Sequence, residues 1–194
     1  ESWYANCPGL KVVVPSNVYD AKGLLKSSIR DDDPVLFMES EQMYGDKGMV
    51  PEEDYTLPIG VADIKRSGSH VTVVSFGKII KIALEVAEEL SAENIEVEVI
   101  DLRTVRPIDY DTVIESVKKT NRLICLEEAW PLGSISTELT YMVQKRAFDF
   151  LDAPIIRLTT ADTPAAYAPT LMEAFLPNKE QLTNAIREVL YQKP

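Results

Sequence analysis

In the stretch "VTVVSFGKIIKIALEVAEEL" (residues 71–90), a strand-like run passes directly into a helical one. Four of its first six residues are apolar and the other two are Thr and Ser, as in a short strand that is buried on both faces. From residue 79 the apolar residues return at helical spacing and share one face: Ile79, Ile82, Ala83, Val86 and Leu90. A strand that leads into an amphipathic helix is typical of strand–helix–strand units.

The same alternation continues to the end of the chain. Further strands are expected at 96–101, 122–127 and 154–158, and further helices at 110–120, 134–147 and 179–191. Strands that alternate with helices predict a parallel sheet with helices on both faces, which is an α/β fold.

A shorter strand–helix–strand series precedes this one, at residues 11–15, 18–30 and 35–40. Asn17 is the expected N-cap of the helix, and Asp20 lies in its first turn, where a negative charge is favourable. Residues 41–58 contain Gly, Pro and many acidic residues without apolar periodicity, so they are predicted to link two lobes.

The amino-acid composition limits the kinds of molecule that the protein is expected to bind. The 194 residues are 45% hydrophobic, and 31 acidic against 20 basic residues give a net charge of -11. This balance argues against nucleic acid or an anionic membrane as partner and favours a basic protein. The two cysteines, Cys7 and Cys125, suggest neither a disulfide framework nor a zinc site, so a reducing compartment is expected.

Few residues carry recognisable chemistry. Ligands of open parallel sheets bind beyond the carboxyl ends of strands, so the loops after Ser75, Asp101 and Glu127 matter most, and none matches a phosphate-binding motif. The single histidine, His70, precedes a strand and thus lies at the wrong end of the sheet. Arg103 and Arg106 fit either a solvated loop or an anion clamp. The chain therefore reads as part of a site, with no catalytic residue of its own.

The stretch "SSIRDDDP" (residues 27–34) places three carboxylates after the end of a helix, where the helix dipole is already negative. One interpretation is a polar turn that Pro34 terminates. The other is a cation site, in which the free carbonyls of Ser28 and Ile29 join two Asp side chains in an all-oxygen cluster.

Several long motifs in order, "WYANCPGLKVVVPSNVYDAKGLLKSSIRDDDPVLFMESEQMYG", "VEVIDLRTVRPID" and "LEEAWPLGSISTEL", resemble the beta subunits of pyruvate dehydrogenase components. The resemblance implies a transketolase-like, thiamine-diphosphate-dependent enzyme of which this chain is the carboxy-terminal part. Residues 1–45 would end the pyrimidine-binding domain, 46–57 would be a linker, and 58–194 would be the transketolase carboxy-terminal domain, which serves dimer assembly. In this family the Glu that activates the aminopyrimidine and a His near the active-site channel lie upstream of "WYANCPGLKV", and the alpha subunit holds the diphosphate and magnesium.

The resemblance also implies two sites within the chain. Ser28 and Ile29 through their carbonyls, together with Asp31 and Asp33, match a potassium site of related beta subunits, although Asp33 stands where relatives carry Asn. Asp152 matches a position that contacts the subunit-binding domain of the dihydrolipoyl acyltransferase. Its alternative role is a loop cap before Pro154.

The expected function is oxidative decarboxylation of pyruvate with acyl transfer to lipoyl groups, in the bacterial cytoplasm or the mitochondrial matrix. The partners would be an alpha subunit, a second beta subunit and the acyltransferase, with neither nucleic acid nor membrane. A chain that opens "ESWYANCPG" is expected to be part of a longer protein, inactive alone and used for assembly. The alternatives are a beta subunit for branched-chain 2-oxo acids or acetoin, and a free-standing α/β assembly module without catalysis.

Overall fold

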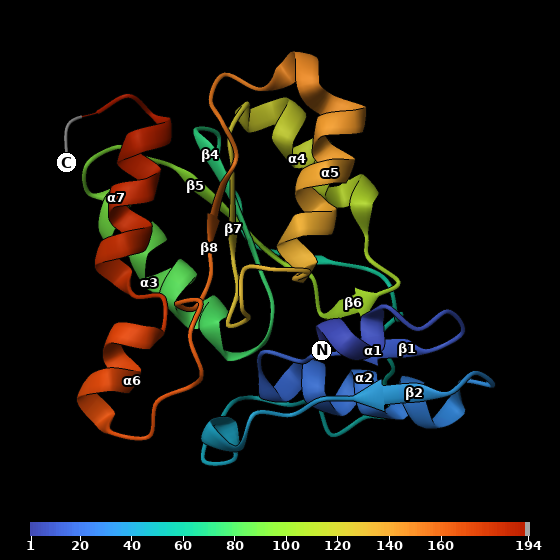
Figure 1. Cartoon of the computed structure of the whole chain (residues 1–194). Helices are drawn as coiled ribbons and strands as arrows, with labels where there is room; N and C mark the ends of the chain where they lie inside the picture. The colour runs from blue at the N-terminus through green and yellow to red at the C-terminus, as the bar shows by residue number, and fades with distance from the viewer. Residues whose placement is uncertain (193–194) are drawn as a thin grey trace.

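The computed structural model describes residues 1–192 and has two α/β units, one against the end of the other (Figure 1). The N-terminal unit contains α1 (Ser2–Ala5), β1 (Lys11–Val13), α2 (Val18–Arg30), β2 (Val35–Phe37) and η1 (Glu41–Met43). The second unit begins with β3 (Asp63–Arg66), β4 (Val71–Ser75), η2 (Gly77–Ile79), α3 (Ile80–Ser91), β5 (Val97–Asp101) and β6 (Thr104–Arg106). It continues with α4 (Tyr110–Thr120), β7 (Leu123–Leu126), α5 (Ile135–Ala147), η3 (Phe148–Phe150), β8 (Ile156–Leu158), α6 (Pro169–Phe175) and α7 (Lys179–Val189).

The large sheet has the order β3-β5-β4-β7-β8. Its last four strands are parallel, which confirms the predicted α/β fold, and β3 is an antiparallel edge strand that the sequence pattern did not predict. Successive residues of a strand face opposite sides. Val73 therefore packs with α3 and α7, and Val74 with α4 and α5, so both faces of the sheet are buried (Figure 1).

Local signals fix the ends of the helices. Asn17 accepts a hydrogen bond from the backbone N–H of Asp20 at the start of α2, as predicted, and Asp109 caps α4 in the same way. Asn121 ends α4 in the left-handed conformation at φ 63°, which Asn tolerates well. Both helices have the bounds that the sequence predicts.

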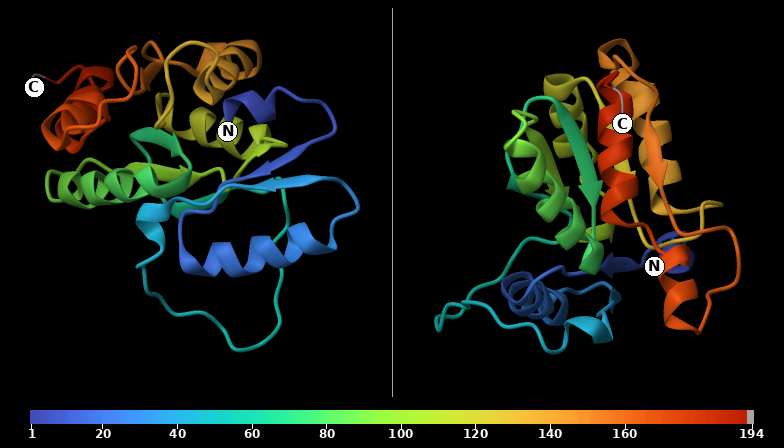
Figure 2. Two further views of the ribbon diagram at one scale, coloured as in Figure 1. Left: turned by 60° about the horizontal axis from the view of Figure 1, so that its bottom comes forward. Right: turned by 90° about the vertical axis from the view of Figure 1, so that its left-hand side faces the viewer.

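A small sheet joins the two units. It has the order β2-β1-β6, in which β1 is parallel to β2 and antiparallel to β6. Strand β6 follows β5 in the chain yet pairs with β1, so the backbone of the second unit completes the sheet of the first. Figure 2 shows β4 running toward the N-terminal unit, which lies across the end of the large sheet.

The residues between the two units lie along α2. The backbone N–H of Leu57 donates to the Gly23 carbonyl, and the Tyr55 ring stacks on Tyr19 with centroids 4.7 Å apart. A Cβ at Gly23 would come within 2.7 Å of Leu57, so the glycine permits this close approach. In the described part of the chain, residues 44–62 form neither helix nor strand.

Candidate functional site

The carboxyl ends of β4, β5 and β7 meet at one edge of the large sheet, where ligands of open α/β sheets bind. The N-terminal unit covers this edge. The backbone N–H of Val14 donates to the Arg103 carbonyl at 2.8 Å, and the Ser16 hydroxyl donates to the Asp101 carboxylate. Nη1 of Arg106 donates to the Ala5 carbonyl at 2.9 Å. The edge is therefore an interface between the two units.

A cluster of five charged side chains lies at this interface, and we call it the interface charge cluster: Asp20, Asp63, Lys65, Asp101 and Arg103. Nζ of Lys65 is 2.7 Å from Asp20 Oδ2, 2.6 Å from Asp63 and 3.9 Å from Asp101. Nη2 of Arg103 lies 2.8 Å from both Asp20 Oδ1 and Asp63 Oδ2. Asp20 comes from α2 and the other four residues from the second unit, so ion pairs within the cluster connect the two units.

The cluster contains three carboxylates and two cations, and Asp20 and Asp101 have no solvent exposure. Burial raises the pKa of Asp101 to about 6, although hydrogen bonds from Ser16 and from the Arg103 backbone N–H oppose this rise. Burial also acts to lower the pKa of Lys65, but its bonds to Asp20 and Asp63 outweigh burial and the pKa is raised. Lys65 is thus held in its charged form.

Arg103 is neither a solvated loop residue nor part of an anion clamp with Arg106. Its side chain is buried among the carboxylates of the cluster, and its backbone has φ 58°. Arg106 instead reaches α1 through the Ala5 carbonyl. The two arginines therefore serve different contacts.

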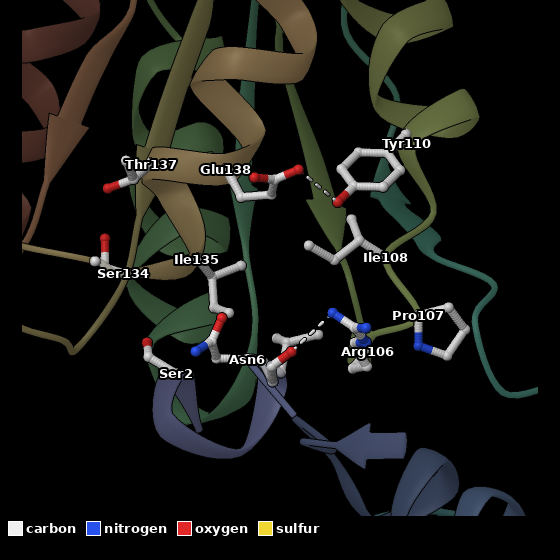
Figure 3. Close-up of a pocket in the computed structure, with 13 residues that line it drawn as sticks. Ser2, Asn6, Arg106, Pro107, Ile108, Tyr110, Ser134, Ile135, Thr137 and Glu138 are labelled. Atoms are coloured by element: carbon white, nitrogen blue, oxygen red, sulfur yellow. Dashed lines mark hydrogen bonds between the residues drawn. The ribbon is translucent and has the colours of Figure 1, made fainter. Parts of the chain in front are cut away.

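A cavity of about 580 Å³ lies beside the interface, between α1, the turn from β6 to α4, and the start of α5 (Figure 3). The Tyr110 hydroxyl donates to Glu138 Oε1 at 3.2 Å, and burial, reinforced by the Glu138 charge, raises the pKa of Tyr110 to about 12. Ser2, Asn6 and Arg106 line the opposite end. Apart from Arg106, no residue of this cavity was predicted from the sequence to belong to a site.

The acidic turn after α2 holds the residues predicted to bind a cation. Helix α2 ends at Arg30, so the carbonyls of Ser28 and Ile29 belong to its last turn. Lys11 Nζ lies 2.7 Å from both oxygens of Asp31 and 3.0 Å from Asp33 Oδ2. The hydrogen bond from Lys11 lowers the pKa of Asp31, with a further bond from the Asp33 backbone N–H. An ammonium group therefore contacts both carboxylates of the predicted site.

These contacts decide how well the turn fits a metal ion. Over residues 1–192, no group of three or more His, Cys, Asp or Glu side chains is arranged to hold one. The carboxylates of Asp31 and Asp33 are already engaged by a cation, so they do not fit a second. The assignment of Ser28, Ile29, Asp31 and Asp33 to potassium stays a prediction.

Asp152 lies at the opposite end of the large sheet. Its backbone N–H donates to the Asn121 carbonyl at 2.9 Å, and its carbonyl accepts from the Tyr191 hydroxyl at 2.7 Å. The carboxylate is 3.4 Å from Nη2 of Arg122 and more than half exposed. The backbone is thus fixed while the carboxylate stays accessible, and its contact with an acyltransferase stays a prediction.

His70 and the two acidic residues that follow β7 have structural partners. His70 lies before β4 as expected, and its Nδ1 accepts from the Glu96 backbone N–H at 2.8 Å. Glu127 is buried and accepts from the Ser136 hydroxyl, and Glu128 pairs with Lys78 at 3.0 Å. Within residues 1–192, no helix combines the length and apolar character that a membrane crossing requires.

The fold and the covered sheet edge define a class, an α/β domain whose strand ends are closed by part of a second α/β unit. The chain belongs to the transketolase family: the C-terminal domain of transketolase matches residues 60–182, and its pyrimidine binding domain matches residues 1–47. A solved structure of a split-gene transketolase, an inactive beta4 tetramer, shares the fold with a TM-score of 0.79 at 21% identity. It is covered over 61% of its length, and this chain over 100%.

Sequence relatives confirm the resemblance to pyruvate dehydrogenase beta subunits. The pyruvate dehydrogenase E1 component subunit beta of Rhizobium meliloti is 50% identical over 98% of this chain and 42% of its own length. The acetoin:2,6-dichlorophenolindophenol oxidoreductase subunit beta of Bacillus subtilis is 48% identical over 96% of this chain and 55% of its own length. The chain spans about half the length of the curated relatives it matches.

Proposed function

We propose that this chain forms part of the beta subunit of a thiamine-diphosphate-dependent pyruvate dehydrogenase. The complete enzyme would decarboxylate pyruvate and transfer the acyl group to a lipoyl group. The observation that carries the proposal is the 50% identity to the Rhizobium meliloti subunit, which extends over 98% of this chain. The length of the match supports a shared function more strongly than any single motif.

The role of the chain within that enzyme would be assembly. A diphosphate requires backbone N–H groups or cations that face open space. At the sheet edge the cations Lys65 and Arg103 are paired with carboxylates, so these residues do not fit a diphosphate. We therefore place the diphosphate and its magnesium on an alpha subunit, and infer contacts to that subunit, to a second beta subunit and, through Asp152, to a dihydrolipoyl acyltransferase.

The location follows from the relatives. Named relatives include bacterial subunits and a mitochondrial subunit of Caenorhabditis elegans. We infer the bacterial cytoplasm or the mitochondrial matrix for this protein. The net charge of -11 favours basic protein partners there.

A second candidate function is oxidation of acetoin, because the Bacillus subtilis relative is 48% identical. The two candidates differ in the substrate that the complete enzyme accepts. A beta subunit for branched-chain 2-oxo acids is tested by the same assay with a different substrate.

The experiment is a titration of the purified chain with thiamine diphosphate and magnesium, alone and with the alpha subunit of the Rhizobium meliloti enzyme. Each mixture is then assayed for dye reduction with pyruvate, acetoin or a branched-chain 2-oxo acid. The alpha subunit with the complete beta subunit is assayed in the same way to identify the substrate, because the Glu and His of the family are expected upstream of "WYANCPGLKV". We expect neither binding nor turnover for the chain alone, and co-purification of the chain with the alpha subunit. Saturable binding and turnover by the chain alone would overturn the assembly role. Failure to bind the alpha subunit would favour the free-standing module.

A further inference from the structure

We propose that the Lys11 ammonium takes up the two carboxylates, Asp31 and Asp33, that a potassium ion would need in the acidic turn after α2. The charge of the turn would then be partly offset by the chain itself, and the turn would bind no potassium. This proposal concerns the folded chain and does not depend on the enzymatic activity proposed above.

Backbone pairing places Lys11 at the turn. Lys11 is the first residue of β1, and its N–H donates to the Pro34 carbonyl at 3.0 Å. It lies opposite Val35 in the parallel pair of β1 and β2. Neighbouring strands are about 4.8 Å apart, so a lysine side chain at this register easily reaches the turn that precedes β2. The position of the ammonium therefore follows from the sheet register.

The ammonium satisfies the requirements of the site. A lysine carries three N–H donors and a single positive charge. Lys11 Nζ has three carboxylate oxygens within 3.0 Å, two from Asp31 and one from Asp33. The side chains of Lys11 and Asp31 are only 26% and 18% exposed, so the pair is partly removed from water. The three donors thus have three acceptors.

Charge balance explains why a cation belongs here. The last carbonyls of α2 lack helical partners and carry partial negative charge, and Asp31, Asp32 and Asp33 add three carboxylates. The lysine offsets this charge, as a bound ion would. A potassium ion on the same carboxylates would lie close to the ammonium and be repelled by it. Lysine and potassium therefore exclude each other at this site.

The test compares melting temperatures of the chain in potassium chloride and in choline chloride at matched ionic strength. The wild type is expected to melt at the same temperature in both salts. Lys11→Met keeps most of the side-chain length but removes the charge. It should melt below the wild type in choline chloride and rise by about 2–4 °C in potassium chloride, as expected for potassium at a few times its dissociation constant.

Two control variants isolate the effect. Lys26→Met removes another lysine of this unit, one that pairs with Asp54, and should show no potassium-specific rise. Lys11→Arg keeps the charge and should behave like the wild type in both salts. A potassium-specific rise in the wild type would overturn the proposal, as would equal melting of Lys11→Met in the two salts. If Lys11→Met does not fold, Lys11→Gln, which also removes the charge, takes its place in the same comparison of the two salts.

Discussion

Asp101 makes the stability of the chain depend on pH in an unusual direction. The residue is fully buried at the end of β5, where the Ser16 hydroxyl and the Arg103 backbone N–H donate to it. Lys65 is 3.9 Å away, too far for a close ion pair. Burial therefore dominates and raises the pKa from 3.8 to about 6. Between these values the folded chain keeps a proton that the unfolded chain has released.

The sign and size of the effect follow from this difference in bound protons. A raised carboxyl pKa adds stability that is fully present below pH 3.8 and is lost as the pH rises through about 6. One pKa unit corresponds to about 1.4 kcal/mol, so a shift of roughly two units amounts to about 3 kcal/mol. Relative to a variant without this carboxyl, the wild type should lose that amount between pH 4 and pH 8.

The assay is urea unfolding of the wild type and Asp101→Asn at several pH values from 4 to 8. Asn retains an oxygen that can accept from the Arg103 N–H, so the variant is expected to fold. Circular dichroism is the suitable probe, because Trp3 is 83% and Trp130 46% exposed. Asp54→Asn is the control: the bond from Lys26 lowers the pKa of Asp54, so its difference from the wild type should stay constant above pH 5. Parallel stability curves for the wild type and Asp101→Asn would refute the reasoning.

Three further substitutions test the interface and the core. Asp20→Asn removes the buried negative charge that pairs with Lys65 and Arg103, and it should lower the free energy of unfolding in urea by about 3 kcal/mol. The loss should be no larger, because Asp63 still contacts both cations. Gly68→Ala would place a Cβ 2.2 Å from the Glu98 backbone nitrogen, and thermal melting should show a loss of at least about 3 kcal/mol. Ile124→Ala empties a fully buried position and should lose about 2–5 kcal/mol in urea unfolding, whereas Leu132→Ala, at 92% exposure, should change stability by less than about 0.5 kcal/mol.

The helices and strands that were predicted well from the sequence are those whose formation depends on signals within their own segment. Helices α2 and α4 have the predicted bounds, because each combines apolar periodicity with a capping side chain at its start. Strands β4, β5 and β7 lie within one residue of the predicted ends, since fully buried parallel strands are continuous apolar runs. In these segments tertiary packing agrees with local propensity.

The elements that the sequence missed depend on distant partners. Strand β6 has three residues and exists only through its pairing with β1, and β3 carries the charged side chains of an edge strand. Helix α6 is short and none of its residues is buried, so its sequence has no apolar stripe from which a helix could be predicted. Apolar periodicity cannot detect such elements.

The charged sites were also only partly predictable from the sequence, because their partners are distant in the chain. From the sequence, Asp20 was expected only in the first turn of a helix, and Arg103 in a solvated loop or an anion clamp. Only the fold brings the two side chains together. The acidic turn was expected to be either a polar turn or a cation site, and the cation that the structure provides there is Lys11, twenty residues from Asp31. Charge requirements can thus be predicted from sequence, whereas the group that meets them depends on sheet register.

The two family domains matched along the chain are not two separate structural units. Strand β6 lies within residues 60–182, which match the transketolase C-terminal domain. Its backbone nevertheless pairs with β1, which lies within residues 1–47, the match to the pyrimidine binding domain. The side chain of Arg103 also depends on the N-terminal unit, because one of its two carboxylate partners is Asp20 of that unit. Separating the units would expose the backbone of β6 and leave buried charges unpaired, and both changes are unfavourable. The sheet edge that other α/β proteins use for ligands is therefore used here to hold the two units in one orientation.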